Sequence, residues 1–327
     1  MRKTSLPILI LFIVVLVTFL SYNFKEDVKR NTKDKAFVKV DKENDGRDKK
    51  IGLKSPEGRI TSLLEKSNHS LVPNIVHYVW FSVDERLKFH QMISIRSAYL
   101  FIKPEMIILH CDNEPVGRWW KYVKNFVKTL IIRKTTPPRE ILGKRLVKVE
   151  HQSDIARIQI LQQYGGIYLD FDVIALKSFK NLRYYNFTMG LEYFGTPGRL
   201  NNGIIISERN ATFLRMWLDS YKTFNPSEWD EHDCQEPYKL MFKYPHLVHI
   251  EEKTLNYPSG KPTELKLIYE GLYNWTANYA IHTWYRLYEL EHGPDSIKTM
   301  NTTYGEICRL IYYGNSTLIK PKTRLKG

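Results

Sequence analysis

A helical pattern runs directly into a strand pattern between Ser153 and Leu176, and two glycines are all that separates them. Residues 154–164 place their large aliphatic side chains on one helical face, at Ile155, Ile158 and Leu161. Ser153 is a suitable N-cap for this helix, and Gly165–Gly166 is a suitable stop. The apolar residues that follow, IYLDFDVIAL, predict a buried strand. A helix joined so closely to a strand is typical of an α/β sheet.

The same alternation of strand and helix patterns continues on both sides of this stretch. LVPNIVHYVWF, which begins at Leu71, and EMIILHC, which begins at Glu105, predict two strands. Helical length and spacing follow at residues 84–101 and 116–133. Farther on we expect a strand, a helix and an aromatic segment at residues 201–207, 211–224 and 279–290. These patterns predict one α/β domain over residues 71–327, with a mostly parallel central sheet.

The N-terminus carries a pattern typical of membrane targeting. Arg2 and Lys3 precede an apolar run from Leu6 to Leu20, which the flanking residues extend to residues 5–22. A cleavable signal peptide is the alternative, but TFLSYNFK offers no small-x-small cleavage site. We therefore expect an uncleaved signal-anchor helix, with residues 1–4 in the cytoplasm and the rest of the chain in the lumen.

A charged stretch and several glycosylation sequons support that orientation. Residues 23–59 contain twelve Lys or Arg and eight Asp or Glu, so residues 23–70 are expected to form a solvated stem. Six N-x-S/T sequons follow the anchor. They begin at Asn68, Asn186, Asn210, Asn274, Asn301 and Asn315. Together these features predict a single-pass type II protein of the Golgi membrane.

The formal charge of +14 suits a polyanionic partner, which could be nucleic acid, an anionic membrane surface or a phosphorylated substrate. The chain shows no nucleic-acid motif, and a lumenal location argues against nucleic acid. Cysteine is sparse, at Cys111, Cys234 and Cys308. One disulfide could form in the lumen, but the sequence does not rank the three pairings.

Two carboxylates, Asp170 and Asp172, interrupt the apolar strand pattern. Most acidic pairs of this kind are structural or solvated. If the regular part of the strand ends early, however, both carboxylates lie at its C-terminal end, where open α/β sheets bind their ligands. Two carboxylates can hold a hard divalent cation and leave positions for phosphate oxygens and water. Such a cation neutralises the charge that develops on a departing diphosphate.

The stretch SDIARIQILQQYGGIYLDFDV resembles the donor-binding signature of the DXD-containing sugar transferases. That family includes the yeast initiating mannosyltransferase and animal α-1,4-galactosyl- and α-1,4-N-acetylglucosaminyltransferases, and the clostridial toxin glucosyltransferases have a similar run. The resemblance extends back to VPNIVHYVWF and forward to NNGIIIS and AIHTW, and so covers most of residues 71–290. It implies a GT-A nucleotide-binding sandwich and transfer with retention of the anomeric configuration.

The resemblance also implies roles for individual residues. Asp170 and Asp172 match the metal and diphosphate motif, and Asp172 is the expected direct ligand. Asp154 and Arg157, one helical turn apart, match a pair that holds hydroxyls of the donor sugar. Trp80 matches an aromatic residue near the nucleotide base, and His282 with Trp284 matches a late segment that contacts the metal or diphosphate. A divalent cation, with manganese favoured, is the implied cofactor.

Each of these residues also has a structural interpretation. Asp154 and Arg157 could form a surface ion pair, and Trp80 and His282 could be core residues. The sequence departs from the family at Ser82, where glycine is frequent, and the segment HDCQEPYKL aligns loosely. The implied donor is a nucleotide-diphosphate sugar, with UDP-galactose or UDP-N-acetylglucosamine ahead of GDP-mannose. The acceptor is a glycan or a glycolipid.

The sequence does not single out a catalytic nucleophile. The candidates are Asp219, Glu228, Asp230, Glu231 and Asp233. A non-catalytic lumenal glycan-binding protein is the alternative function. If the metal site exists, Asp172→Asn abolishes transfer. Because two metal-free carboxylates repel each other, we expect the same change to leave stability unchanged or slightly raised.

Overall fold

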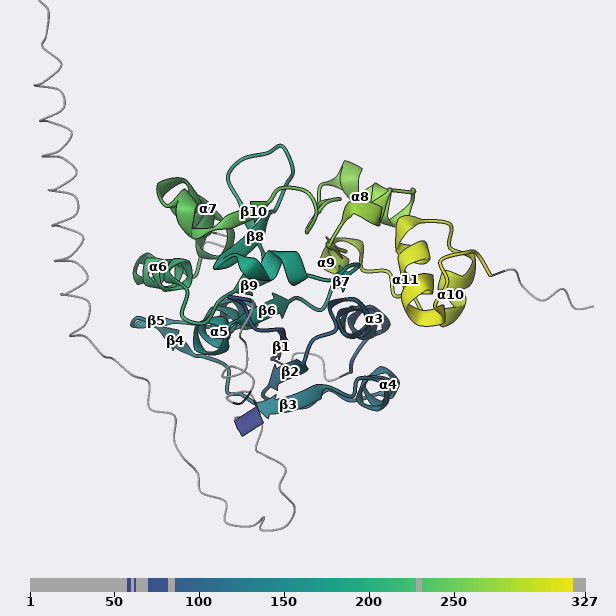
Figure 1. The fold of residues 1–327 in the computed structure, drawn as a ribbon, viewed down its shortest axis with the longest axis horizontal. Coiled ribbons are helices and arrows are strands. Elements are labelled where there is room, and N and C mark those ends of the chain that lie inside the picture. The colour runs from purple at the N-terminus through teal and green to yellow at the C-terminus, as the bar shows by residue number, and fades with distance from the viewer. Residues whose placement is uncertain (1–57, 60–61, 63–69, 82–85, 228–230, 320–327) are drawn as a thin grey trace, which may run out of the picture. The chain divides into compact units, whose positions relative to one another are not determined.

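A seven-stranded sheet runs through the part of the chain that the computed structural model describes, residues 58–59, 62, 70–81, 86–227 and 231–319 (Figure 1). The predicted anchor, nearly all of the predicted stem and the sequon at Asn68 lie outside these residues, as does Ser82. None of the helices in the described ranges is long and apolar enough to span a membrane.

The strand order is β10–β8–β9–β6–β1–β2–β3. Parallel pairs join β1 to β2 and β6, β2 to β3, and β8 to β10, whereas β9 runs antiparallel to β6 and β8. The predicted α/β fold with a mostly parallel central sheet is confirmed. The strands are β1 Ile75–Trp80, β2 Met106–Cys111, β3 Leu130–Lys134, β6 Gly166–Leu169, β8 Phe187–Leu191, β9 Leu200–Ser207 and β10 His249–Glu251.

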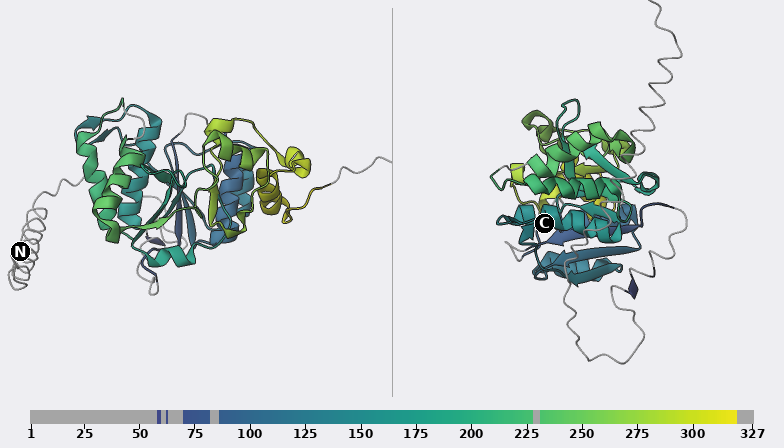
Figure 2. Two further views of the ribbon diagram at one scale, coloured as in Figure 1. Left: turned by 90° about the horizontal axis from the view of Figure 1, so that it is seen from above. Right: turned by 90° about the vertical axis from the view of Figure 1, so that its left-hand side faces the viewer.

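Helices cover both faces of this sheet (Figure 2). One face carries α5 Val149–Tyr164, α6 Thr212–Ser220 and α7 Glu236–Lys243. The other face carries α3 Phe89–Ser97, α4 Arg118–Phe126, α8 Pro262–Tyr269, α10 Pro294–Thr299 and α11 Thr303–Tyr313. Because both faces are covered, the strands β1, β2 and β6 are buried at every position, and most of their side chains are apolar rather than alternating with polar ones.

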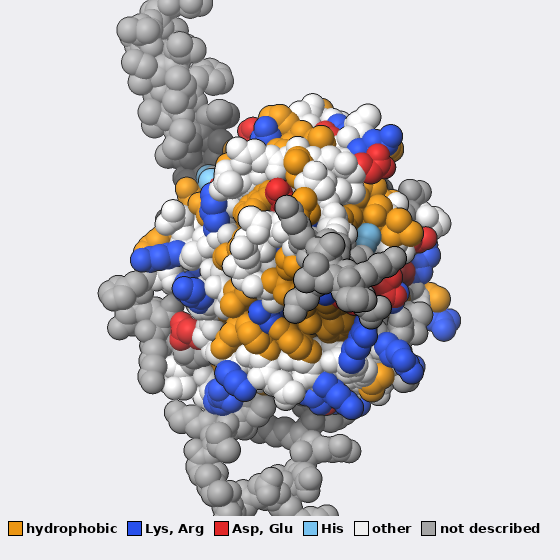
Figure 3. Space-filling model, turned by 90° about the vertical axis from the view of Figure 1, so that its right-hand side faces the viewer, with side chains coloured by type: hydrophobic (Ala, Val, Ile, Leu, Met, Phe, Trp, Pro, Cys, Tyr) orange, Lys and Arg blue, Asp and Glu red, His pale blue; other side chains and the backbone are white. Residues whose placement is uncertain are grey.

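The surface seen in Figure 3 is the side on which α10 and α11 lie, and Lys and Arg side chains are spread over it between apolar and uncharged ones. The sequon asparagines that the structure describes are all exposed: Asn186, Asn210, Asn274, Asn301 and Asn315. The three cysteines are buried and no disulfide joins any two of them, so the disulfide considered from the sequence is not formed.

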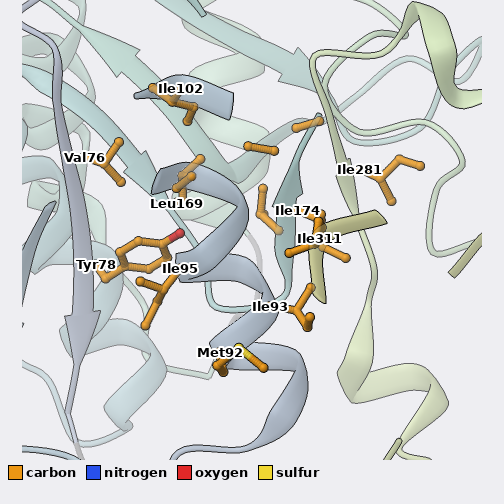
Figure 4. Close-up of a cluster of buried hydrophobic side chains, with 14 of the residues drawn as sticks. Val76, Tyr78, Met92, Ile93, Ile95, Ile102, Leu169, Ile174, Ile281 and Ile311 are labelled. Atoms are coloured by element: carbon orange, nitrogen blue, oxygen red, sulfur yellow. The ribbon is translucent and has the colours of Figure 1, made fainter. Parts of the chain in front are cut away.

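The core on the α3 face joins the sheet to a smaller element (Figure 4). Tyr78 of β1 lies beside Ile95 of α3, and Met92 and Ile93 of the same helix belong to the same cluster as Ile174. Ile174 belongs to β7 Val173–Ala175, which pairs antiparallel with β11 Ala280–His282. The described residues also include the short hairpin of β4 Glu140–Ile141 and β5 Lys144–Arg145 and the single turn α9 Tyr285–Tyr288.

Two expected boundaries are wrong. The helix before the glycines begins at Val149, with Lys148 as its N-cap, so Ser153 is an interior residue. Its hydroxyl donates to the Val149 carbonyl (3.0 Å), which is how serine is accommodated inside a helix. Residues 116–133 are not one helix, because α4 ends at Phe126 and the β-branched residues that follow belong to β3.

Candidate functional site

Asp170 and Asp172 lie in the turn between β6 and β7, at the C-terminal end of β6. The Asp170 N–H donates to the Gly203 carbonyl of β9 (2.8 Å), and the Ser94 hydroxyl of α3 donates to the Asp170 carbonyl (3.3 Å). The Asp172 carbonyl accepts both the N–H and the hydroxyl of Thr283 (2.8 Å each). The predicted strand therefore ends at Leu169, and its neighbours fix both carboxylates at the edge of the sheet.

Asp172 pairs with His282. The Asp172 Oδ1 lies 3.0 Å from His282 Nε2, and the Tyr285 N–H donates to Oδ2 (3.0 Å). Burial opposes the charge of Asp172, but the nearby His282 and the Tyr285 N–H outweigh it and lower the pKa of Asp172 to about 2. Burial likewise opposes the charge of His282, and Asp172 raises the pKa of the imidazole above its ordinary value.

Asn201 and Trp284 fix the orientation of the His282 ring. The Gly203 N–H donates to Asn201 Oδ1 (3.0 Å), which leaves the Asn201 amide nitrogen facing His282 Nδ1 (3.3 Å). The Trp284 indole stacks on the imidazole with a centroid distance of 4.1 Å and an interplanar angle of 19°. His282 therefore presents Nε2 to Asp172.

Asp170, Asp172 and His282 can hold a metal ion together. One ligand atom from each lies within 4.8 Å of the others. Gly203 faces this group, and a Cβ there would lie 3.0 Å from Asp170 Oδ2 and 3.1 Å from His282 Cε1. Two carboxylates and an imidazole form a ligand set that suits a divalent cation, and the glycine keeps a side chain out of the group. The residues present therefore fit the predicted cation.

Arg157 connects this group to Asp154. Its Nη1 lies 3.4 Å from Asp170 Oδ1 and donates to the Asn202 carbonyl (2.9 Å), while Nη2 lies 3.2 Å from Asp154 Oδ1. The side chains of Arg157 and Asp154 are 7% and 9% exposed, so the surface ion pair considered from the sequence is wrong. Burial raises the pKa of Asp154 to about 6 although Arg157 opposes the shift. The guanidinium bridges two carboxylates in a buried position.

Asp233 joins the same network from a turn far along the chain. The Asn202 amide nitrogen lies 3.0 Å from Asp154 Oδ1 and 3.4 Å from Asp233 Oδ2. Burial and the nearby Asp154 raise the pKa of Asp233 to about 8. Of the other nucleophile candidates, Asp219 is exposed and pairs with Lys222, and Glu231 lies beside His232. Glu228 and Asp230 lie outside the described residues.

Two cavities meet at these residues. A cavity of about 360 Å³ is lined by Asp154, Asp172, Asp233 and His282. A second cavity, of about 320 Å³, is lined by Trp80, Phe81, Gln91 and Phe171. Glu150, Arg157 and Asp170 line both. The predicted residues therefore line two cavities that share Asp170, and Trp80 and Asp233 belong to different ones.

The sequence reading missed Asn201 and Asn202 and did not distinguish Asp233 from its neighbours. Asn201 and Asn202 open β9, where two amides precede an otherwise apolar strand. Two amides next to an apolar strand were the feature of the sequence that could have identified these residues as part of the site. Asp233 had no such signal, because its role depends on contacts with residues that are 31 or more positions away.

Sequence comparisons relate the chain to known proteins. The family described as "Glycosyltransferase sugar-binding region containing DXD motif" matches residues 23–188, just over half of the chain. The match begins within the predicted stem. Glucan organizing enzyme 1 of Cryptococcus neoformans var. grubii is 32% identical over 268 residues, which are 76% of this chain and 72% of that protein.

Structure comparisons find similarity at low sequence identity. The galactosyltransferase LgtC, in complex with donor and acceptor sugar analogues, is 13% identical with a TM-score of 0.38, and the match covers 76% of this chain and 98% of that one. Mouse xyloside xylosyltransferase 1 is 12% identical with a TM-score of 0.41, and the match covers 64% of this chain and 96% of that one.

Proposed function

This chain belongs to the family of glycosyltransferases whose sugar-binding region contains a DXD motif, and we propose that it is a metal-dependent, retaining hexosyltransferase. The proposed donor is a nucleotide-diphosphate sugar, with UDP-galactose or UDP-N-acetylglucosamine ahead of GDP-mannose. One observation carries the proposal: Asp170, Asp172 and His282 meet beside the buried Arg157 and Asp154, between two cavities.

The two cavities suit the two halves of such a donor. Trp80 packs edge-on against Phe171 at a centroid distance of 5.3 Å, and its Nε1 has no hydrogen-bond partner among the described residues. Aromatic walls bind a flat base by stacking and dispersion. The larger cavity has several carboxylates in its wall, which accept hydrogen bonds from hydroxyls. We therefore place the base beside Trp80 and the sugar beside Asp154.

The residues of the chain then have distinct tasks. A cation held by Asp170, Asp172 and His282 would supply positive charge for the diphosphate that leaves. Arg157 bonds to Asp170 and Asp154 and so fixes the distance between the diphosphate end and the sugar end of the site. Asp172, held by His282 and the Tyr285 N–H, stays ionised at neutral pH. Manganese is the proposed ion.

The proposed acceptor is a glycan or a glycolipid. The Cryptococcus relative is named for organising glucan, and this favours a polysaccharide among the glycans. The proposed location is the Golgi lumen, with the chain anchored by residues 5–22. The basic N-terminal flank, the apolar run and the exposed sequons support this location. Family membership favours an enzyme over the non-catalytic glycan-binding alternative.

Calorimetric titration of the full-length chain with UDP and with GDP, each with and without manganese, tests the proposal. We expect UDP to bind with manganese and to bind at least about tenfold more weakly after the metal is chelated, because the cation contacts the diphosphate. Asp172→Asn should remove the manganese effect, and Asp219→Asn, which changes an exposed carboxylate, should not. Absence of binding by either nucleotide would overturn the proposed function.

A further inference from the structure

A further cavity lies between α5 and the β4–β5 hairpin, which is beside that helix in Figure 1. Its volume is about 290 Å³. The cavity is lined by Pro137, Arg139, Arg145, Leu146, Val147 and Gln152. None of these residues lines either of the two cavities at the candidate site. A ligand in this cavity would therefore contact a different set of side chains from the proposed donor.

The hairpin that forms one wall of this cavity is held firmly. Its turn is Leu142–Gly143, and both residues have positive φ, +48° and +77°, as tight two-residue hairpin turns require. Ile141 and Leu146 are buried in the core on the α5 face of the sheet. The Gln152 amide nitrogen of α5 donates to the Leu146 carbonyl (3.1 Å). The backbone of the hairpin is therefore fixed against the sheet and the helix.

Positive charge is concentrated around the cavity. Residues 133–148 contain six Lys or Arg and one acid, Glu140, so the formal net charge of this stretch is +5. Arg139 and Arg145 both line the cavity, and neither guanidinium has a hydrogen bond or ion pair with another described residue. Glu140 is opposite Arg145 in the hairpin but forms no ion pair with it. Because unpaired like charges around one cavity repel each other, an anion between the two arginines would stabilise the arrangement.

The lining indicates which anion fits. Guanidinium groups present paired N–H donors that match the oxygens of a phosphate or a carboxylate. A phosphomonoester carries nearly two negative charges at neutral pH and so can neutralise both Arg139 and Arg145, whereas a carboxylate carries one. Pro137, Leu146 and Val147 supply an apolar wall that suits the C–H groups of a small ring. No aromatic side chain lines the cavity, so the described residues offer no surface on which a nucleotide base could stack.

We propose that this cavity binds a phosphomonoester of a sugar or polyol, with the phosphate between Arg139 and Arg145 and the ring against Leu146 and Val147. A volume of about 290 Å³ is at the lower end of the range for ligand cavities, which suits one ring with its phosphate. The phosphate can belong to a soluble phosphosugar or to the head group of a phosphorylated lipid. The inference does not depend on the proposed function, because its residues are not those of the proposed active site.

Calorimetric titration of the full-length chain tests the proposal and distinguishes the two sources. Glucose 6-phosphate represents a soluble phosphosugar, and short-chain, water-soluble phosphatidylinositol 4-phosphate represents a lipid head group. We expect at least one of them to bind saturably, and its counterpart without the phosphomonoester, glucose or short-chain phosphatidylinositol, to bind at least about tenfold more weakly. Tighter binding of glucose 6-phosphate would assign the cavity to soluble phosphosugars, and tighter binding of the lipid would assign it to a head group.

Substitutions separate this cavity from the general attraction of anions to a basic chain. Arg139→Gln and Arg145→Gln should each weaken binding of the preferred phosphomonoester about 10- to 100-fold. Arg118→Gln removes one positive charge from an exposed position of α4 and is the matched control; it should weaken binding less than about twofold. Residues 23–70 are the same in every variant, so their charges do not contribute to the difference.

Three outcomes would overturn the proposal. Neither phosphomonoester binds wild type, or Arg118→Gln weakens binding as much as the two cavity substitutions do. The third is that inorganic phosphate binds as tightly as the preferred phosphomonoester, because the apolar wall would then contact no ring. Arg139 and Arg145 are exposed, so their substitution should leave Tm within about 2 °C of wild type. If a variant nevertheless fails to fold, the wild-type comparisons with glucose, short-chain phosphatidylinositol and inorganic phosphate still decide.

Discussion

Replacing Asp172 by asparagine should destabilise the metal-free protein as well as abolish transfer. The sequence suggested the opposite for stability, because two neighbouring carboxylates repel each other. In the structure the partners differ: Asp172 meets His282 and the Tyr285 N–H, whereas Asp170 meets Arg157 and the Tyr168 hydroxyl. Each carboxylate is compensated separately, so the substitution removes an attraction rather than a repulsion.

The magnitude follows from the pKa of Asp172, which falls from 3.8 to about 2. A carboxylate with a lowered folded-state pKa stabilises the fold at pH values above 3.8, and this contribution is lost as the pH falls toward 2. The full contribution at neutral pH is about 2 kcal/mol. The side chain is 20% exposed and asparagine can still accept the Tyr285 N–H, so about 1–2 kcal/mol should be lost.

Thermal unfolding at pH 7 in EDTA measures this loss. For a body of this size, Asp172→Asn should lower Tm by roughly 3–6 °C, and Asp219→Asn, at an exposed carboxylate, should change it by less than about 1 °C. Transfer with manganese should fall at least about a hundredfold in Asp172→Asn. An unchanged or raised Tm would refute the pairing with His282, and near-normal turnover would refute the metal site.

Three further results are expected. His77 and His110 are buried and hydrogen-bonded to each other (3.1 Å), and burial lowers the pKa of His77 to about 4. The free energy of unfolding should therefore be at its full value above pH 6.5 and fall by about 3 kcal/mol as the pH drops toward 4. Urea unfolding at a series of pH values would measure this fall, and a flat profile would contradict it. Gly166→Ala should lower the free energy of unfolding by about 2 kcal/mol or more, because φ is +110° and the new Cβ would lie 2.6 Å from the Ile75 carbonyl oxygen. The control Gly293→Ala places its Cβ in open space and should lower it by only a few tenths of a kcal/mol. Equal Tm values for the two variants would contradict this account. Full-length protein made in the secretory pathway should migrate faster on a denaturing gel after N-glycosidase treatment, since its described sequon asparagines are exposed. Unchanged gel mobility would count against the lumenal location.

The sequence predicted the parts of the site that depend on local geometry. Asp154 and Arg157 fall on one helical face because three positions make nearly one turn, and Asp170 follows a strand that ends where its carboxylate interrupts the apolar run. His282 lies with Asp170 and Asp172 in a group that could hold a metal ion, which is where the resemblance placed it. The start of α5 was missed because serine is common both as a cap and inside a helix, where its hydroxyl can bond to the preceding turn.

The remaining features required the tertiary structure. The bridge from Arg157 to Asp170 joins a helix to the strand that follows it, and Asn202 reaches Asp154 and Asp233 only because β9 lies beside β6. No spacing in the sequence predicts that β9 inserts antiparallel between β6 and β8. The pKa of Asp233 depends on the same neighbours, so its difference from Asp219 and Glu231 was invisible in the sequence.

The antiparallel pairing of β9 with β8 also places one wall of the larger cavity in a loop and the neighbouring two amides in a paired strand. Leu191 of β8 pairs with Leu200 of β9, so residues 192–199 form a loop beyond the last strand pair. Glu192, Tyr193 and Arg199 of this loop line the larger cavity, whereas Asn201 and Asn202 lie within the paired strand. Insertions or deletions in the loop would reshape one wall of the cavity without moving the two amides. Chains that differ from this one only in the loop would therefore differ in the shape of that cavity wall while keeping the same group of Asp170, Asp172 and His282.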